Sequence, residues 1–133
     1  MLPRLYTEEY LKIIVGKQRF SKNNNHLTAL NAVLGNPVWD LLDRGGKRWR
    51  PTLCMLIAEL YGKPRQSVFE LSALIELIHN GSLILDDIED DSLHRRGKEC
   101  VHILHGVDVS INAGSFMYCA PMMVILQSSN YTS

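Results

Sequence analysis

The 133-residue sequence has little cysteine, no net charge and no apolar segment at its start. Its three cysteines are widely spaced and odd in number, which fits reduced thiols rather than a disulfide framework. Basic and acidic residues balance at 14 each, and we expect no nucleic-acid partner. The first nine residues carry early acids and no apolar signal core, so we expect no targeting signal and a cytoplasmic protein.

Strand patterns are also missing. No stretch of useful length alternates apolar and polar residues, and successive helical patterns are instead separated by Gly and Pro. The apolar run 116–126 is too short to cross a bilayer and contains Pro121, so we expect the beginning of a buried helix and no membrane span. The sequence therefore predicts an all-α fold.

A short helix is predicted just before a glycine-rich turn. Asn36 is its candidate N-cap, Pro37 takes its first position, and Gly45 lies past its end. Pro51 is expected to start the next helix. The apolar residues of that next helix look like ordinary core: Leu53, Leu56, Ile57 and Leu60.

A longer helix is expected to end in the most acidic segment of the chain. Its start is predicted at Ser67, which forms a capping-box pattern with Glu70. Five of the six residues in 86–91 are carboxylates. Carboxylates at a helix C-terminus oppose the helix dipole, and they cannot all be buried and ionised without cations. A solvated helix end is the plain alternative, but the apolar residues 83–85 just before the acids favour a cation site.

The helical repeat sorts these acids by direction. At about 100° per residue, His79, Asp86 and Asp90 project within a narrow sector, with Asp87 at its flank. Mg²⁺ keeps several waters and is usually held by one or two carboxylates plus substrate phosphates, so this set suits it. A calcium loop would need alternating ligands and a central glycine, and a zinc site would need companion ligands for the histidine. We therefore expect Mg²⁺ that bridges to a diphosphate.

A basic turn upstream offers a second anion site. Gly45 and Gly46 let the backbone approach an anion closely, while Lys47 and Arg50 supply a point charge and a forked donor. A basic turn alone is common on any surface. Beside the acidic run, however, it indicates two separately bound anionic groups, one held through metal ions. The other would be held directly by basic side chains, namely Lys47, Arg50, His79 and Arg96.

These residues form two motifs in a fixed order. The upstream motif is Gly45-Gly46-Lys47-Arg48-x-Arg50-Pro51. The downstream motif is His79-Asn80-x-Ser82-Leu83-Ile84-x-Asp86-Asp87-Ile88-Glu89-Asp90-x-Ser92-x-x-Arg95-Arg96-Gly97-x-x-x-x-His102, followed by Ile111-Asn112. At this spacing, the motifs resemble those of the trans-isoprenyl diphosphate synthases, or polyprenyl synthetases, and most of all the eukaryotic geranylgeranyl diphosphate synthases.

The resemblance implies a fold and a reaction. The fold would be the N-terminal helices of an isoprenoid synthase helical bundle, here truncated. The reaction would be the Mg²⁺-dependent, head-to-tail condensation of isopentenyl diphosphate with an allylic diphosphate. The resemblance also implies roles for site residues. The metal ligands would be Asp86, Asp87 and Asp90, Arg95 would contact the allylic diphosphate, and isopentenyl diphosphate would be held by Lys47, Arg50, His79 and Arg96.

Product length would depend on residues one and two turns before the acids. Gly81 and Ser82 are small, whereas family members that stop at the farnesyl length often have bulky aromatics there. A geranylgeranyl-length or longer product is therefore expected. In the alternative interpretation, Gly81 only permits tight helix packing, and Ile78 could close the pocket.

The length of the chain limits these expectations. Family members are roughly twice as long, as expected for one large helical domain around a substrate cavity. We expect residues 1–118 to be the N-terminal half of a synthase domain and 119–133 a divergent tail. Without a second aspartate-rich motif, we expect the chain alone to turn over little substrate. Because family members commonly form homodimers, the resemblance implies a homodimer or a heterodimer with a full-length synthase.

Three alternatives to a synthase stay open. A non-catalytic subunit or truncated isoform could pair with a full-length synthase. A terpene cyclase binds only one diphosphate, so the turn at 45–51 argues against it. The third alternative is an inactive helical fragment.

Overall fold

The computed structural model describes residues 24–127 of the chain, and in this part the fold is almost entirely helical. The elements, in order, are α2 (Asn24–Leu30), the π-helical segment η1 (Asn31–Gly35), α3 (Asn36–Asp43), α4 (Trp49–Leu60), the 3-10 helix η2 (Arg65–Val68), α5 (Phe69–Glu89), β1 (His94–Arg95), β2 (Lys98–Glu99), α6 (Val101–His105) and α7 (Val107–Gln127). The strands β1 and β2 form a small antiparallel hairpin. The all-α prediction is confirmed.

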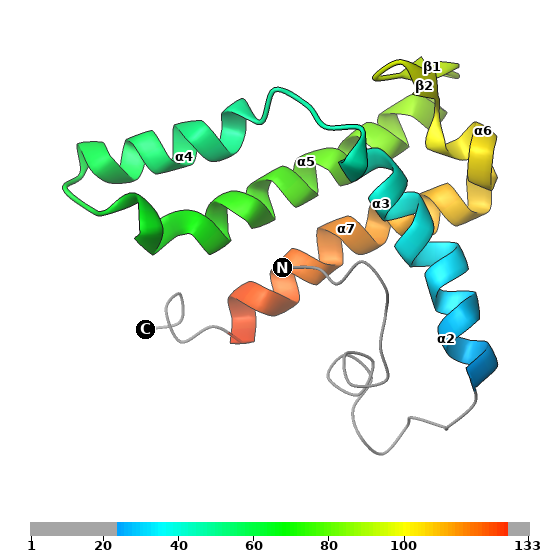
Figure 1. Ribbon diagram of the computed structural model, residues 1–133, viewed down its shortest axis with the longest axis horizontal. Helices are drawn as coiled ribbons and strands as arrows, with labels where there is room; N and C mark the ends of the chain where they lie inside the picture. The colour runs from blue at the N-terminus through cyan, green and yellow to red at the C-terminus, as the bar shows by residue number, and fades with distance from the viewer. Residues whose placement is uncertain (1–23, 128–133) are drawn as a thin grey trace.

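Helix α5 is the centre of the molecule. It packs against α4 on one side and α7 on the other, while α3 crosses near its C-terminal half (Figure 1). The buried core lies where α3, α5, α6 and α7 meet. Its fully buried members include Leu41, Ile84, Val101 and Met117. The C-terminal end of α5 and the hairpin that follows it are therefore anchored to the best-packed region.

The predicted N-cap at Asn36 is wrong, because the chain is already helical before it. α2, η1 and α3 are continuous, and Asn36 has helical backbone angles of φ −62° and ψ −48°. Pro37 has no backbone N–H and would break a regular helix, whereas a π-helical turn just before it lets the chain continue. Gly45 does lie past the end of α3, with φ +78°.

The predicted capping box at Ser67 is also wrong. Helix α5 begins at Phe69, and its N-cap residue makes no side-chain capping bond. Ser67 instead donates its hydroxyl to the Pro64 carbonyl oxygen at 2.7 Å, inside the 3-10 turn η2. Similarly, α4 begins at Trp49 rather than at Pro51.

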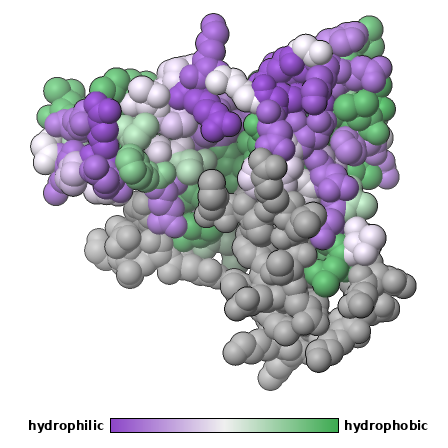
Figure 2. All heavy atoms as spheres, in the orientation of Figure 1, coloured by the Kyte–Doolittle hydropathy of each residue, from purple (hydrophilic) through white to green (hydrophobic). Residues whose placement is uncertain are grey.

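Helix α4 does not bury its apolar residues as predicted. Leu53, Leu56 and Ile57 are exposed, and Leu60 is 83% exposed. Among the described elements α4 packs chiefly against α5, so one side of it stays uncovered. Figure 2 shows apolar residues reaching the surface at the far end of the α4–α5 pair, next to hydrophilic ones.

One described segment, Arg65–Glu89, is long and apolar enough to cross a membrane by length and composition. It contains α5, the helix at the centre of the bundle. Core helices commonly have the same length and composition, so this property alone is weak support for a membrane span.

Candidate functional site at the end of helix α5

The acids at the end of α5 divide into two environments. Asp86 and Asp90 are exposed and lie one helical turn apart, with the Asp90 N–H donating to the Asp86 carbonyl oxygen at 2.8 Å. Asp87, 100° further round the helix, is only 1% exposed. The structure therefore brings Asp86 and Asp90 together on the surface and turns Asp87 into the protein.

Asp87 is engaged by an arginine of the hairpin. The Arg95 Nε lies 2.7 Å and 2.8 Å from the two carboxylate oxygens, and its Nη2 lies 2.6 Å from Oδ1. This charge-assisted hydrogen bonding raises the pKa of Arg95. The buried thiol of Cys100 also contacts Asp87, and burial raises its pKa to about 11. Direct metal ligation by Asp87 would require this cluster to open.

The second arginine of the hairpin reaches the glycine-rich turn. Arg96 donates Nη1 to the Gly45 carbonyl oxygen and, at 3.3 Å, to that of Leu41. A Cβ added to Gly46 would lie 3.1 Å from the Arg96 Cζ, so the lack of a side chain permits this approach. Burial is the main cause that lowers the pKa of Arg96. The two sequence motifs are thus in direct contact.

His79 lies half-buried among the cationic side chains. Its pKa is lowered, first by burial and then by the positive charges of Arg50, Arg96 and Arg95, against an opposing contribution from Glu76. The structure therefore brings His79 together with three of the predicted diphosphate-binding arginines. An anion bound among them would offset their field and favour the protonated imidazole.

The other two residues of the basic turn are more open. Lys47 is exposed, and the guanidinium of Arg50 lies 4.6 Å from the ring centroid of Trp49. Arg48 between them has φ +48°, a left-handed conformation that allows the chain to turn into α4. This geometry leaves Lys47 exposed and Arg50, like Arg96 of the hairpin, half-buried.

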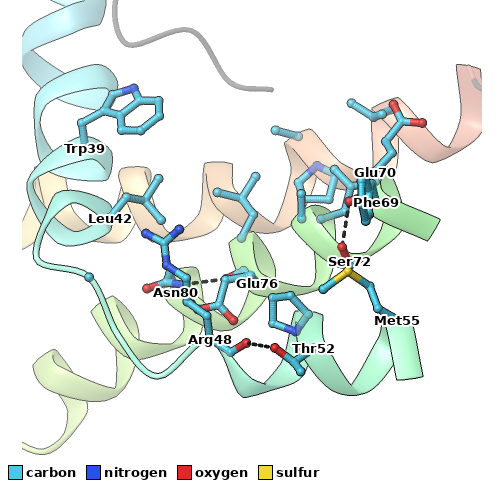
Figure 3. A pocket seen from close by; sticks show the side chains of 18 of the residues that line it. Trp39, Leu42, Arg48, Thr52, Met55, Phe69, Glu70, Ser72, Glu76 and Asn80 are labelled. Carbon is cyan, nitrogen blue, oxygen red and sulfur yellow. Dashed lines mark hydrogen bonds between the residues drawn. The ribbon is translucent and has the colours of Figure 1, made fainter. Parts of the chain in front are cut away.

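A cavity of about 1030 Å³ extends from this region between α3, α4, α5 and α7. Its lining carries charges of both signs, from Arg48 and Arg96 and from Asp43, Glu70 and Glu76. Met55 and Phe69 contribute apolar surface (Figure 3). Asn80 also lines it and donates Nδ2 to the Glu76 carbonyl oxygen at 2.7 Å. The cavity thus combines apolar walls with charged groups of both signs.

The predicted chain-length residues, Ile78, Gly81 and Ser82, are not among the residues that line this cavity. A Cβ on Gly81 would come within 2.8 Å of the Met117 Cβ and 2.9 Å of the Gly114 carbonyl oxygen. Gly81 therefore permits close packing of α5 on α7, as in the alternative interpretation of the sequence.

The donor set fits a metal ion that is shared with phosphate. Among the residues that the structure describes, no group of three His, Cys, Asp or Glu side chains is placed to hold a metal by itself. Asp86 and Asp90 are nevertheless two exposed carboxylates on one face. Mg²⁺ bound by one or two carboxylates plus substrate oxygens needs no more than this from the protein.

Sequence reasoning missed Asp40 and Arg44. Arg44 is buried, lies 2.5 Å from the Asp40 carboxylate through Nη2, and donates Nη1 to the Arg95 carbonyl oxygen at 3.1 Å. The spacing of the pair, four residues on a helix, was the available signal. Nothing in that spacing indicates the second bond, to a residue 51 positions away.

Comparison with known proteins places these features in context. A family model described as "Polyprenyl synthetase" matches residues 31–133. Solanesyl-diphosphate synthase 2 (chloroplastic) of Oryza sativa subsp. japonica is 39% identical, and the match covers 89% of this chain and 32% of that protein. Geranylgeranyl pyrophosphate synthase of Eremothecium gossypii is 35% identical, and the match covers 71% of this chain and 30% of that protein.

Solved structures agree with the sequence matches. A geranylgeranyl pyrophosphate synthetase from the archaeon Geoglobus acetivorans superposes with a TM-score of 0.70 at 28% identity, covering 92% of this chain and 36% of that one. The crystal structure of another geranylgeranyl pyrophosphate synthase superposes with a TM-score of 0.69 at 29% identity, and the match covers 94% of this chain and 37% of that one. The chain spans about a third of the length of these relatives.

Proposed function

Because the chain belongs to the polyprenyl synthetase family, we propose that it forms the diphosphate-binding part of an isoprenyl diphosphate synthase. The reaction is the condensation of isopentenyl diphosphate with an allylic diphosphate. The observation that carries the proposal is the direct contact between the two motifs, in which Arg96 reaches Gly45 while Arg95 engages Asp87. This contact juxtaposes a carboxylate pair with a cationic cluster, as two neighbouring diphosphates require.

The allylic diphosphate is assigned to the end of α5. Asp86 and Asp90 would hold Mg²⁺, which when bound neutralises the charge that develops on the departing diphosphate. Arg95 keeps 28% of its side chain exposed while it binds Asp87, so it can contribute a further donor to the same anion. No protein nucleophile is needed, because the double bond of the second substrate attacks the allylic carbon.

Isopentenyl diphosphate is assigned to the basic cluster. Lys47, Arg50, His79 and Arg96 would hold its diphosphate group. Burial is the main cause that lowers the pKa of His79, but Arg50, Arg96 and Arg95 lower it further, and an anion bound among them would offset this second contribution. The apolar part of the neighbouring cavity would take hydrocarbon and exclude water from the reacting carbons.

Product length, assembly and location are part of the proposal. Relatives named as geranylgeranyl and solanesyl synthases support a product of geranylgeranyl length or longer. A non-catalytic subunit or short isoform that pairs with a full-length synthase is the second candidate. A homodimer and a cytoplasmic location stay predictions.

Binding and turnover test these proposals separately. We expect the chain to bind pyrophosphate in the presence of Mg²⁺, and calorimetry should show this binding weakened at least tenfold in Asp86→Asn. Asp91→Asn, at an exposed carboxylate outside the pair, is the matched control. A wild-type chain without Mg²⁺-dependent pyrophosphate binding would refute the site.

Turnover is measured with labelled isopentenyl diphosphate and farnesyl diphosphate. We expect little product from the chain alone. Mixed with a full-length synthase, it should alter the yield or length of the products. If the chain neither associates with a synthase nor alters its products, the second candidate fails, whereas the first is decided by the Mg²⁺-dependent binding of pyrophosphate.

A further inference from the structure

We propose that Arg44 is a positioning residue that fixes the β1–β2 hairpin on α3 and thereby holds Arg95 on Asp87. Arg44 lies outside both sequence motifs, which span residues 45–51 and 79–102. The consequence for diphosphate binding rests on the proposed function, whereas the effect on Arg95 itself does not. Arg44 would act through Arg95 and would not touch substrate.

The placement of Arg44 is the first argument. Its side chain has 0% exposure, so its charge has been removed from water at a considerable cost. One Nη binds the Asp40 carboxylate at 2.5 Å, and the other donates to the Arg95 carbonyl oxygen at 3.1 Å. A planar fork can serve both acceptors at once, and a lysine ammonium at the same site could not do so with the same geometry.

The hairpin needs such an anchor. Each of its strands has two residues, which is too short for independent stability. Its turn places Arg96 at φ +54° and Gly97 at φ +77°. A non-glycine residue in this left-handed region costs energy and is retained only where surrounding contacts hold it.

Hydrogen bonds between α3 and the hairpin are donated from both sides. Arg44 donates from the end of α3 to the backbone of the hairpin, and Arg96 donates from the hairpin back to carbonyl oxygens at the end of α3. Asp40 also lies 3.9 Å from the His105 Nε2 on α6. With its backbone held at this junction, Arg95 can present its guanidinium to Asp87 in one orientation.

The decisive variant is Arg44→Lys, which keeps the charge and most of the buried stem but loses the fork. We expect hydrogen exchange of the Arg95 Nε–H, followed by NMR, to become at least fivefold faster. We also expect pyrophosphate binding in Mg²⁺ to weaken about tenfold. If both quantities stay at their wild-type values, the proposal is overturned.

Two controls separate positioning from general stability. Arg65→Lys changes another arginine that binds a carboxylate through two nitrogens, Glu59 at 2.5 and 3.0 Å, but on the exposed surface. Ala58→Gly weakens α4 without touching the hairpin. Both should leave the Arg95 exchange rate unchanged. If Ala58→Gly, at an equal loss of thermal stability, accelerates that exchange as much as Arg44→Lys does, Arg44 is merely structural and the proposal fails.

A second variant covers the case in which Arg44→Lys does not fold. The double variant Asp40→Asn with Arg44→Gln removes both charges while keeping polar groups, and the same acceleration of Arg95 exchange is expected. Wild-type exchange rates in this variant would overturn the proposal. Should the wild-type chain itself bind no pyrophosphate, the proposed function fails, and the Arg95 exchange rates still decide the role of Arg44.

Discussion

Asp86 and Asp87 are adjacent in the chain and opposite in environment. The helix turns by about 100° between them, so one carboxylate reaches solvent and the other meets Arg95 below the surface. A run of acids can therefore contain both a metal-binding group and a structural ion pair. The two roles can be separated by substitution.

Asp87→Asn should destabilise the fold while Asp86→Asn should not. The first change leaves the half-buried Arg95 without its carboxylate, for which we expect a loss of about 1–3 kcal/mol in the free energy of unfolding. The second change is at the surface and should stay within about 0.5 kcal/mol of wild type. Urea unfolding measures both. Equal losses in the two variants would contradict the structural assignment of Asp87.

His79 should report on the bound anion through its protonation. In the free protein its pKa lies below the ordinary value of 6.5, mainly because of burial and then because of Arg50. A bound diphosphate would offset that positive field and raise the pKa. By linkage, the contribution of His79 to anion affinity is then small above the bound-state pKa and grows as the pH falls through it.

An NMR titration of the His79 imidazole, with and without pyrophosphate and Mg²⁺, measures this shift. We expect a higher pKa in the complex. The variant His79→Gln should lose part of the gain in affinity at low pH, and comparison with wild type removes the titration of pyrophosphate itself. An unchanged His79 pKa in the complex would remove this residue from the site.

At the scale of elements, the contact between α5 and α7 depends on missing side chains. Gly81 and Gly114 face each other, and a Cβ on either would meet the carbonyl oxygen of the other at 2.9 Å or 3.2 Å. Two helices can approach this closely only where neither carries a side chain at the crossing. This packing is one of the two interpretations that the sequence allowed for Gly81, and a role in product length stays a prediction.

Gly81→Ala should therefore destabilise the fold despite the better helix propensity of alanine. We expect a loss of about 1–3 kcal/mol from overpacking against Met117. Ser82→Ala, at the next position, is the matched control, because the Ser82 hydroxyl bonds only within its own helix, to the His79 carbonyl oxygen at 2.8 Å. Thermal unfolding followed by circular dichroism measures both. A more stable Gly81→Ala protein would show that α7 can move away.

Prediction of elements worked best in their interiors and worst at their ends. The apolar spacing of α5 places it as a long helix, but its start was misassigned because Pro64 nucleates a 3-10 turn that takes up the Ser67 hydroxyl. The end of α3 was found from Gly45, since the positive φ there is a local requirement. Local sequence signals predict the end of a helix correctly where one residue must have a positive φ, as Gly45 does. They predict the start of a helix wrongly where another segment accepts the hydrogen bond of the expected capping side chain, as Pro64 does for Ser67.

At the scale of the whole molecule, stability should depend on the thiol beneath the ion pair. Cys100 is buried, and its pKa rises from 9.0 to about 11, first through burial and then through Asp87. The unfolded chain would ionise this thiol at lower pH than the folded protein does. The stability contributed by the neutral thiol is therefore present below pH 9 and is lost as the pH rises towards 11.

We expect this loss to reach about 2–3 kcal/mol for wild type. The variant Cys100→Ala should show a shallower decline in the free energy of unfolding between these pH values. Cys119→Ala, at an exposed cysteine, should follow wild type. Urea unfolding at a series of pH values measures the three slopes, and identical slopes for wild type and Cys100→Ala would rule out the buried thiol as the cause.

The sequence by itself determined the helical class, the order and spacing of the two motifs and hence the family, because these depend on local periodicity and on residue types. Tertiary structure alone decided which carboxylate is exposed, which arginine is buried and which apolar helix face is covered. Arg44 meets Arg95 and Arg96 meets Leu41 across 51 and 55 positions, respectively. Contacts between residues so far apart leave no local pattern, since they exist only once α3, α5 and the hairpin have packed together.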